Sequence, residues 1–424
     1  MSAVLTMLRV ANRYRELKRS QYWSEQELAS YTKAHLDETL RAAVKIRFYA
    51  GRFGDAPRAE DFTNLPILRR SEVRALNDSV LSLYPRGSRF SSDSSSGSTG
   101  MPAEFLFDAS HQLGRFAARV RYLRENGWSP LRRNVWLIYA VFRTAHNDDE
   151  KLMQSRIVLR SHFISASPDL RDKVDALCRL DPVFLYTFPS YLEVLLNVLA
   201  ETGRKLPSLR KLFTGAEVLE DSLRQRTKQA LGVEIAENYG STEAFLAWQC
   251  PEGKYHVNAE HVLVEIVDEQ GRAVSPGEIG KVLVTTLENR LAPLVRYEIG
   301  DYAVAAEGNC RCGRSLPLIG RIIGRAMNLF RMGDGRLISP WHLSTAVRER
   351  AEVKQFQIVQ NSVQRFTVRF VSDRALTAEG EAAILAGFRK VLGPKMSVGF
   401  EKVQEIGRTR GGKYMTALSE LAMG

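Results

Sequence analysis

The segment Ser91-Ser92-Asp93-Ser94-Ser95-Ser96-Gly97-Ser98-Thr99-Gly100-Met101-Pro102 decides how this chain of 424 residues is interpreted. It holds seven hydroxyl side chains and two glycines, and the apolar stretch 103–107, a predicted strand, follows at once. Glycine lets backbone N–H groups turn toward an anion at little steric cost, and hydroxyls add donors. Such a loop suits a polyphosphate. It is not a Walker A loop, because no Gly-Lys-Ser/Thr follows and the next predicted element is a strand rather than a helix.

A flexible linker is the alternative for a stretch so rich in serine and glycine. A linker should separate two self-contained domains. Only about ninety residues precede this segment, and apolar structure resumes directly after it. Local composition therefore leaves both interpretations open, and the rest of the chain has to decide between them.

Five further motifs follow in a fixed order. They are Phe213-Thr214-Gly215-Ala216-Glu217, Asn238-Tyr239-Gly240-Ser241-Thr242-Glu243, Arg296-Tyr297-Glu298-Ile299-Gly300-Asp301, Gly320-Arg321-Ile322-Ile323-Gly324-Arg325 and Gly407-Arg408-Thr409-Arg410-Gly411-Gly412-Lys413. Together with 95–102, this series resembles the adenylate-forming superfamily of acyl-CoA synthetases, luciferases and adenylation domains. The Gly-Ala-Glu variant and the Cys-x-Cys-Gly-Arg at 310–314 are similar to its phenylacetate–CoA ligase-like branch. The resemblance spans residues from about 60 to 415.

The resemblance implies a set of catalytic and nucleotide-binding residues. It makes Lys413, Glu243 and Thr99 catalytic, with Glu243 as the Mg²⁺ ligand. It assigns nucleotide binding to Ser94, Ser95, Ser96, Gly97, Ser98, Thr99, Gly100, Gly215, Ala216, Glu217, Asn238, Tyr239, Gly240, Ser241, Thr242, Asp301 and Arg325. In this assignment, the hydroxyls and amides of 94–100 hold the β- and γ-phosphates of ATP.

Residue chemistry supports part of this assignment. An aromatic ring beside a glycine, as at Tyr239, can cover an adenine face, and a carboxylate just beyond it can hold Mg²⁺. The alternative for 239–243 is a strand-to-helix turn with an N-terminal cap. A carboxylate such as Asp301 can accept both ribose hydroxyls, although an aspartate after a glycine is also common in turns. By resemblance, Arg325 joins Asp301 at the ribose or meets phosphate.

Lys413 lies in a loop near the end of the chain. A flexible ammonium there can reach both a carboxylate and the α-phosphate and stabilise the charge that develops between them. A solvated basic loop is the alternative for such a composition. The resemblance makes Lys413 the lysine of the adenylation step.

Cys250, His256, Cys310 and Cys312 form a second candidate site. Three thiols and one imidazole are a common tetrahedral Zn²⁺ set, and two short-range pairs brought together by a sheet make a closed structural site. The spacing differs from that of a zinc finger, so buried thiols without metal are the alternative. Cys178 lies on an apolar helix face and is interpreted as core.

Composition limits the class of protein. The chain is 44% hydrophobic and 25% charged, with a net charge of +12. The positive charge is spread along the chain and no nucleic-acid-binding signature accompanies it, so we interpret it as solvated surface that draws in anionic ATP and carboxylate. No apolar run is long enough to cross a bilayer, and Met1–Ser20 alternates apolar and basic residues unlike a signal peptide. A cytoplasmic protein with no specific nucleic-acid or membrane partner is expected. The oligomeric state stays open, a homodimer included.

Hydrophobic patterning predicts an α/β fold in two domains. Helices and short apolar strands alternate from about 103 to 240, which favours a mostly parallel sheet with flanking helices. We expect an N-terminal ATP- and acid-binding domain over 1–326, with a β-rich lobe at about 245–325. Residues 327–424 are expected to form a small α+β domain. The resemblance makes that domain a mobile lid with its hinge near Ala326-Met327-Asn328.

The predicted activity is that of a two-step, AMP-forming acid–thiol ligase. A carboxylic acid attacks the α-phosphorus of Mg·ATP, pyrophosphate leaves, and the acyl-adenylate then forms a thioester with coenzyme A. An aryl acid would suit an aromatic-rich pocket, although the same residues are typical of a core: Trp136, Tyr139, Phe142, Phe184, Tyr186, Phe188 and Phe213. Two alternatives stay open. The acyl group could pass to a carrier-protein thiol or an amine, or the chain could be a basic, non-catalytic binding protein.

Overall fold

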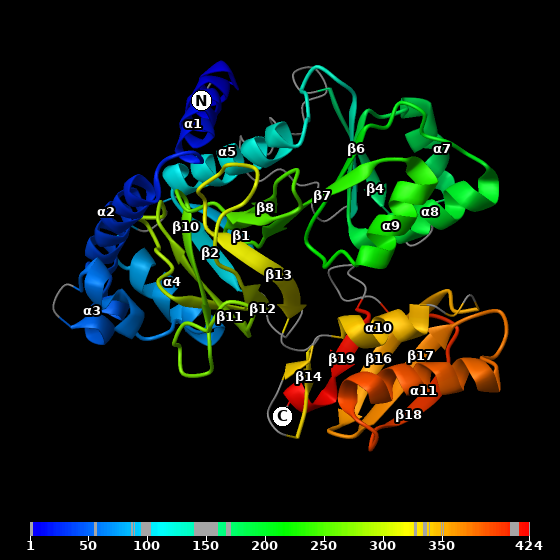
Figure 1. Cartoon of the computed structure of the whole chain (residues 1–424). Helices are drawn as coiled ribbons and strands as arrows, with labels where there is room; N and C mark the ends of the chain where they lie inside the picture. The colour runs from blue at the N-terminus through cyan, green and yellow to red at the C-terminus, as the bar shows by residue number, and fades with distance from the viewer. Residues whose placement is uncertain are drawn as a thin grey trace. The chain divides into compact units, whose positions relative to one another are not determined.

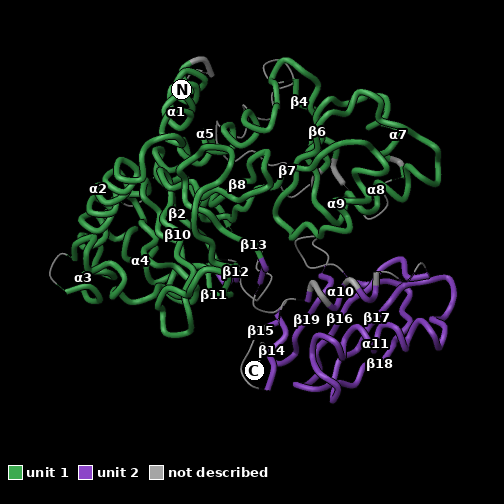
Figure 2. The backbone as a smooth tube through the Cα atoms, in the orientation of Figure 1, with its two compact units in different colours: residues 1–299, 303–322 green, residues 300–302, 323–424 purple. Residues whose placement is uncertain are grey.

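The computed structural model describes residues 3–54, 57–85, 88, 90–94, 103–139, 160–166, 171–325, 329–333, 337–338, 340–348, 350, 352–407 and 415–423. The chain divides into two compact units (Figure 2). The first unit comprises Met1–Ile299 and Ala303–Ile322, and the second comprises Gly300–Tyr302 and Ile323–Gly424.

Helices dominate the start of the first unit. They are α1 (Ala3–Ser20), α2 (Glu25–Ala43), α3 (Arg47–Phe53), the 3₁₀ turns η1 (Ala59–Asn64) and η2 (Arg70–Glu72), and α4 (Val73–Leu81). A capping box starts α2, because Ser24 Oγ accepts the backbone N–H of Glu27 and the Glu27 carboxylate accepts that of Ser24. The strands β1 (Ser91–Ser94) and β2 (Glu104–Phe107) then pair antiparallel. Ser94 lies opposite Glu104, so the two flanks of the serine–glycine stretch are held side by side.

A large sheet forms the body of the first unit, and the helix α5 (Ala109–Glu125) precedes it in the chain. Its strands, in spatial order, are β10 (Val262–Val267), β11 (Ile279–Thr286), β12 (Tyr297–Ala305), β13 (Leu318–Arg325), β9 (Tyr255–Val257), β8 (Phe245–Gln249), β7 (Glu234–Gly240), β6 (Lys211–Thr214), β5 (Phe184–Thr187), β3 (Asn134–Tyr139) and β4 (Ser161–Ala166). The five strands from β7 to β4 are parallel. The helices between them are α7 (Arg171–Leu180), α8 (Pro189–Thr202) and α9 (Asp221–Leu231).

Alternation along the parallel strands gives the sheet two buried faces. In β6, Leu212 packs with α7, α8 and α9 in one apolar cluster, whereas Phe213 packs with α1 and α5 in another (Figure 1). The same alternation separates Leu185 from Phe184 in β5. Residues of both faces of these strands are buried, so the predicted parallel sheet with helices on its faces is confirmed.

The β-rich stretch is joined directly to the parallel strands. β8 pairs antiparallel with β7, β9 with β8, and β13 with β9. Two of the sequence motifs lie on strands. Most of the motif 296–301 forms the start of β12, and 320–325 forms most of β13. The β-rich part therefore continues the same sheet through the β7–β8 turn.

A buried ion pair ties α5 to the loop before β10. Both Nη atoms of Arg121 bond the Glu260 carboxylate, at 2.7 and 3.0 Å, and both side chains are almost completely buried. Arg121 also donates to Leu17 O on α1 at 3.0 Å, and Ser20 Oγ donates to Glu260 at 2.5 Å. Burial raises the pKa of the Glu260 carboxyl, but the Arg121 charge and the hydrogen bonds from Arg121 and Ser20 together hold that pKa below its ordinary value.

We expect Arg121→Met to lower the free energy of unfolding of the first unit by roughly 3–5 kcal/mol, because a buried carboxylate loses its partner. Urea denaturation measures the change. The pair's contribution should be complete above the ordinary carboxyl pKa of 4.5 and should fall as the pH drops through the lower folded value. The double variant Arg121→Met/Glu260→Leu should recover most of the lost stability, and the acid sensitivity of the pair should be absent because no carboxyl remains to titrate. Equal losses in the two variants would contradict the assignment.

The second unit has its own core. Its sheet has the order β18 (Ser397–Lys402), β17 (Arg365–Val371), β16 (Gln355–Ser362), β19 (Ala417–Ser419), and the short pair β14 (Phe330–Arg331) and β15 (Leu337–Ile338) stands apart from it. The helices are α10 (Trp341–Arg348) and α11 (Ala378–Leu392), with the turn η5 (Glu420–Met423). Phe366 contacts both Phe330 and Phe388 edge-on inside this core. The predicted α+β architecture is confirmed.

The fold class therefore agrees with the sequence prediction: a large α/β unit with a mostly parallel sheet segment and a small α+β unit. Among the helices that the structure describes, none is both long enough and apolar enough to span a membrane.

Candidate functional site

Several predicted site residues lie outside the described residues. They are Ser95, Ser96, Gly97, Ser98, Thr99, Gly100, Lys413 and the hinge segment 326–328. Ser94 is described and ends β1. The remaining predicted residues follow the carboxyl ends of β6 and β7 or lie on β12 and β13, and open α/β sheets bind ligands at the carboxyl ends of their parallel strands.

Gly215 and Asn238 are brought into contact where β6 ends. A Cβ added to Gly215 would lie 2.6 Å from Asn238 Nδ2, so only glycine fits there without displacing the amide. Asn238 Nδ2 donates to Thr214 O at 2.9 Å and to the Tyr186 hydroxyl at 3.1 Å. The next residue, Ala216, has a φ of +66°, a left-handed conformation that is costly for alanine and frequent at functional sites.

We expect Gly215→Ala to lower the free energy of unfolding by roughly 1–3 kcal/mol, because the Asn238 amide must move and lose its partners at Thr214 and Tyr186. Thermal unfolding of this variant measures the loss. Gly51→Ala is the control, because nothing lies within 4 Å of a Cβ added to Gly51. Gly232→Ala would not serve, because the positive φ of Gly232 is strained for alanine. Equal stability of the Gly215 and Gly51 variants would contradict the packing argument.

Glu217 has a structural partner at the start of α8. Its carboxylate accepts the backbone N–H of Ser190 at 2.9 Å and the Ser190 hydroxyl at 3.0 Å. A carboxylate at a helix N-terminus satisfies free N–H groups and complements the helix dipole. A role for Glu217 at a nucleotide stays a prediction.

The segment 239–243 is a tight turn between two antiparallel strands. The backbone N–H of Ser241 donates to Ala244 O at 2.9 Å, and β8 begins at Phe245. The alternative of a capped strand-to-helix turn is therefore wrong. Glu243, the predicted Mg²⁺ ligand, is only 2% exposed, and its backbone carbonyl accepts a hydrogen bond from His111 Nε2 at 2.9 Å.

Asp301 and Arg325, predicted as neighbours at the ribose, do meet. Arg325 Nε lies 2.9 Å from Asp301 Oδ1, and both residues belong to the second unit. Gly300 has a φ of +83°, and a Cβ there would lie 3.0 Å from Arg325 Nη1. The glycine therefore leaves room for the guanidinium that orients the Asp301 carboxylate.

The four predicted zinc ligands form one cluster. The ligand atoms of Cys250, His256, Cys310 and Cys312 all lie within 4.8 Å of one another. Cys250 Sγ and Cys310 Sγ are 3.7 Å apart, and Cys312 Sγ lies 3.3 Å from His256 Nε2. Two thiolates bound at about 2.3 Å to a tetrahedral ion would be about 3.8 Å apart, so the donor set fits Zn²⁺.

The protonation of the cluster also suits a metal. His256 Nδ1 lies 3.3 Å from Leu316 O, so Nδ1 carries the proton and Nε2 faces Cys312 with its lone pair. Burial lowers the pKa of His256 to about 4, so the ring is neutral near pH 7. Burial also raises the pKa of Cys250 to about 12, and a bound Zn²⁺ would hold that sulfur as the thiolate. Cys178 packs against the apolar cluster of α7 and α8, as predicted for a core residue.

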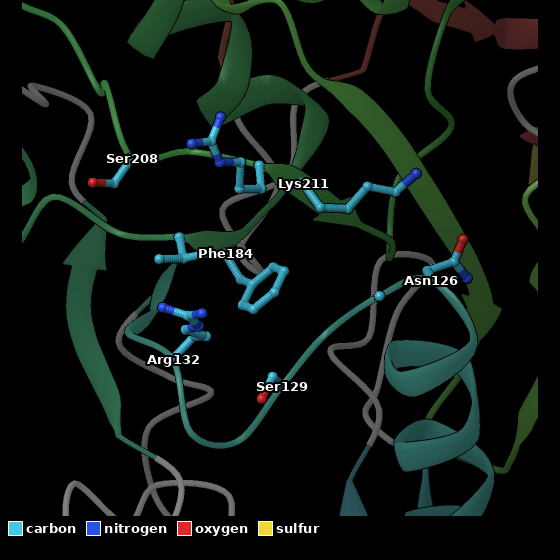
Figure 3. Close-up of a pocket in the computed structure, with 9 residues that line it drawn as sticks. Asn126, Ser129, Arg132, Phe184, Ser208 and Lys211 are labelled. Carbon is cyan, nitrogen blue, oxygen red and sulfur yellow. The ribbon is translucent and has the colours of Figure 1, made fainter.

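A basic pocket of about 550 Å³ lies at the amino ends of the parallel strands β5 and β6 (Figure 3). Phe184 and Lys211, the first residues of β5 and β6, line it together with Arg132. The predicted nucleotide residues follow the other ends of these strands and are absent from its lining. The core interpretation of Phe184 is confirmed, because Phe184 packs with Phe213 in one buried apolar cluster.

Comparison with known proteins places these features in a family. The model of the AMP-binding enzyme family matches residues 95–287, and the model of the CapK C-terminal domain matches residues 330–420. The phenylacetate-coenzyme A ligase of Thermus thermophilus is 27% identical over 281 residues. The chain is similar to the phenylacetate–CoA ligase-like branch of the adenylate-forming superfamily. The predicted resemblance is confirmed.

Several known proteins resemble this chain in part of its sequence or in its fold. The match to the Thermus ligase covers 63% of this phenylacetate–CoA ligase-like chain and 61% of the relative, so it spans less than two thirds of that protein. Protein CapK of Staphylococcus aureus is 27% identical over 221 residues, covering 50% of this chain and 46% of the relative. A 2-hydroxyisobutyryl-CoA ligase in its postadenylation state has the same fold, with a TM-score of 0.77, 19% identity and coverage of 95% and 92%.

Proposed function

We propose that this chain activates a carboxylic acid with Mg·ATP to an acyl-adenylate and then transfers the acyl group to the thiol of coenzyme A. The observation that carries the proposal is the AMP-binding enzyme match, which contains both the serine–glycine stretch and the turn with Glu243. The contact between Gly215 and Asn238 at the carboxyl end of the parallel strands supports it.

Each predicted residue has one task in the proposed reaction. The hydroxyl and amide groups of 94–100 bind the β- and γ-phosphates, and the Asp301 carboxylate accepts the ribose hydroxyls. Glu243 holds Mg²⁺, which neutralises phosphate charge when it is bound. Lys413 stabilises the charge between the attacking carboxylate oxygen and the α-phosphate. Positioning and electrostatics then supply most of the rate, as in other phosphate chemistry with little covalent work for the protein. Residues 327–424 act as the lid.

We propose an aryl acid as the substrate class. Two relatives are phenylacetate-coenzyme A ligases, and a structural neighbour is an anthranilate CoA ligase bound to its acyl-adenylate. In the first unit, the rings of Trp136 and Tyr186 stack 4.7 Å apart, and the Tyr186 hydroxyl accepts the Asn238 amide. Tyr186 therefore connects the aromatic cluster to the predicted nucleotide edge.

Product analysis tests the proposal. The purified protein is incubated with Mg·ATP and a panel of aryl and short hydroxy acids, with and without coenzyme A. We expect AMP and an acyl-CoA by mass spectrometry with at least one aryl acid. Thioester formation only with hydroxy acids would contradict the aryl assignment. AMP release with no thioester would contradict coenzyme A as the acceptor.

Transfer to an amine is the second candidate. The amide bond synthetase McbA of Marinactinospora thermotolerans shares the fold, with a TM-score of 0.56, 18% identity and coverage of 76% of this chain and 67% of that protein. In the same assay, adding amines in place of coenzyme A distinguishes the two acceptors, because only the amine reaction gives an amide that is stable to hydroxylamine.

A further inference from the structure

The first turns of α5 contact two segments that are far apart in the sequence. His111, Gln112 and Arg115 project toward β1 on one side and toward the turn 241–243 on the other. Gln112 Nε2 donates to Ser91 Oγ at 2.9 Å, and His111 Nε2 donates to the Glu243 carbonyl at 2.9 Å. β1 leads into the predicted phosphate loop, and the turn carries the predicted Mg²⁺ ligand. Helix α5 therefore contacts both the strand before the predicted phosphate loop and the turn with the predicted Mg²⁺ ligand.

Arg115 bridges the two segments by itself. Its Nη1 donates to Thr242 O at 2.7 Å, and its Nη2 lies 3.4 Å from Asp93 Oδ2. The guanidinium also lies over the Phe107 ring, 5.5 Å from its centroid, and the side chain is 12% exposed. A planar fork with several donors can fix two acceptors at once, which a single point charge does less well. One largely covered side chain therefore bonds both Asp93 and Thr242.

His111 supports the same turn from inside the unit. Its ring is fully buried between Phe107, at 4.9 Å, and His261, at 4.6 Å between ring centroids. Burial lowers the pKa of His111 well below its ordinary value, so the ring is neutral and Nε2 carries the proton given to Glu243 O. The ring therefore acts as a hydrogen-bond donor and not as a charge.

A second layer fixes His261 behind His111. His261 Nδ1 lies 2.6 Å from Glu288 Oε2, and Arg13 Nη2 on α1 donates to Glu288 Oε1 at 2.5 Å. A Cβ on Gly114 would lie 1.8 Å from Glu288 Oε2, so α5 admits this carboxylate only because residue 114 is glycine. The chain of contacts runs from α1 through Glu288, His261 and His111 to the turn with Glu243, all within the first unit.

We propose that Arg115 is a positioning residue for the adenylation step. Arg115 holds β1 and the turn 241–243 at the separation that lets Glu243 bind the metal on the ATP phosphates. His111 supports the same turn. This role rests on the proposed function. Arg115 and His111 bond backbone carbonyls, so they orient Glu243 without occupying its carboxylate. Misplacing a reacting or binding group by about 1 Å can cost about 100-fold in rate, so these contacts matter more for catalysis than for folding.

The test compares Arg115→Gln and Arg115→Lys with wild type and with Arg124→Gln. Arg124 is the matched control, because it lies on the same helix and also donates to a backbone carbonyl, Trp128 O at 3.1 Å, away from both segments. Carboxylate-dependent ATP–pyrophosphate exchange is measured while Mg²⁺ is titrated, and thermal unfolding is recorded for each protein. Mg·ATP binding without acid is measured by calorimetry.

We expect Arg115→Gln to lower kcat about 10- to 100-fold and to raise the Mg²⁺ concentration for half-maximal exchange severalfold. Arg115→Lys should recover part of both effects, and Arg124→Gln should match wild type. Should Arg115→Gln fail to fold, Arg115→Lys and His111→Gln supply the same readouts. If the wild type is active and the Arg115 variants have the same Mg²⁺ dependence, the positioning role is contradicted and the proposed function is not. A wild type that neither binds Mg·ATP nor exchanges pyrophosphate contradicts the proposed function, and the role with it.

Discussion

Lys413→Ala should lower the rate of adenylate formation by about 100- to 1,000-fold, the usual effect of removing one group that stabilises developing charge. Negative charge accumulates between the attacking carboxylate and the α-phosphate as pyrophosphate leaves. A methyl group in place of the ammonium leaves that charge without its partner. Because the effect belongs to the transition state, kcat should fall much more than the affinity for Mg·ATP. Pyrophosphate exchange and calorimetry measure the two quantities.

Two controls separate this role from a general effect of charge. Lys413→Arg keeps the charge but changes its shape and reach, and should restore only part of the rate. Arg410→Ala removes a neighbouring charge of the same sequence motif and should change exchange less than tenfold. Lys413→Ala supplied with a synthetic acyl-adenylate and coenzyme A should still form the thioester, because the charged step is already complete. Equal losses in the Lys413 and Arg410 variants would remove the assignment of Lys413.

Removing an ion from the cluster of Cys250, His256, Cys310 and Cys312 should lower the stability of the first unit strongly. Cys250 and Cys310 are 60 residues apart in the chain, and a metal bound to both holds the end of β8 against the loop before β13. An ion that binds only the folded state, present at about 1,000 times its Kd, stabilises that state by about 4 kcal/mol. With about 2.1 cal/mol/K of unfolding entropy per residue, this is a Tm shift of roughly 6 °C for a unit of about 320 residues.

Metal analysis and thermal unfolding test this expectation together. We expect about one zinc per chain after purification without chelator, and a fall in Tm when a strong chelator is added. Cys310→Ser should lose the metal and the response to chelator. Cys178→Ser is the matched control, because Cys178 lies outside the cluster, and should retain both. Protein without zinc whose Tm ignores the chelator would show that the four side chains are buried groups without metal.

The parallel part of the fold could be predicted because its pattern is local. Strands covered on both faces are short apolar runs, such as 184–187, and helices between them begin and end near polar residues and glycines. The strands β12 and β13 could not be read in this way, because charged residues and glycines interrupt the apolar residues of 296–301 and 320–325. Their pairing with neighbouring strands, and not local propensity, makes them strands.

Site chemistry could be predicted where residue type limits the role. Three cysteines and a histidine suggest a metal whatever the path of the chain, and the structure brings them within ligand distance. The helix-capping role of Glu217 depends on Ser190, which lies 27 residues earlier and carries no local signal. The contacts of Arg115 with Asp93 and Thr242 depend on the packing of α5 across the unit, which local sequence does not encode. Such side chains could be found only from the folded chain.

Carboxylate-dependent exchange of labelled pyrophosphate into ATP tests the central claim most directly, because exchange requires reversible formation of an acyl-adenylate and no acceptor. With a panel of aryl acids and Mg²⁺, we predict exchange that needs one of these acids and that Lys413→Ala and Glu243→Gln reduce by about 100-fold or more. Absence of exchange with every acid of the panel, in folded protein that fails to bind Mg·ATP, would contradict the account.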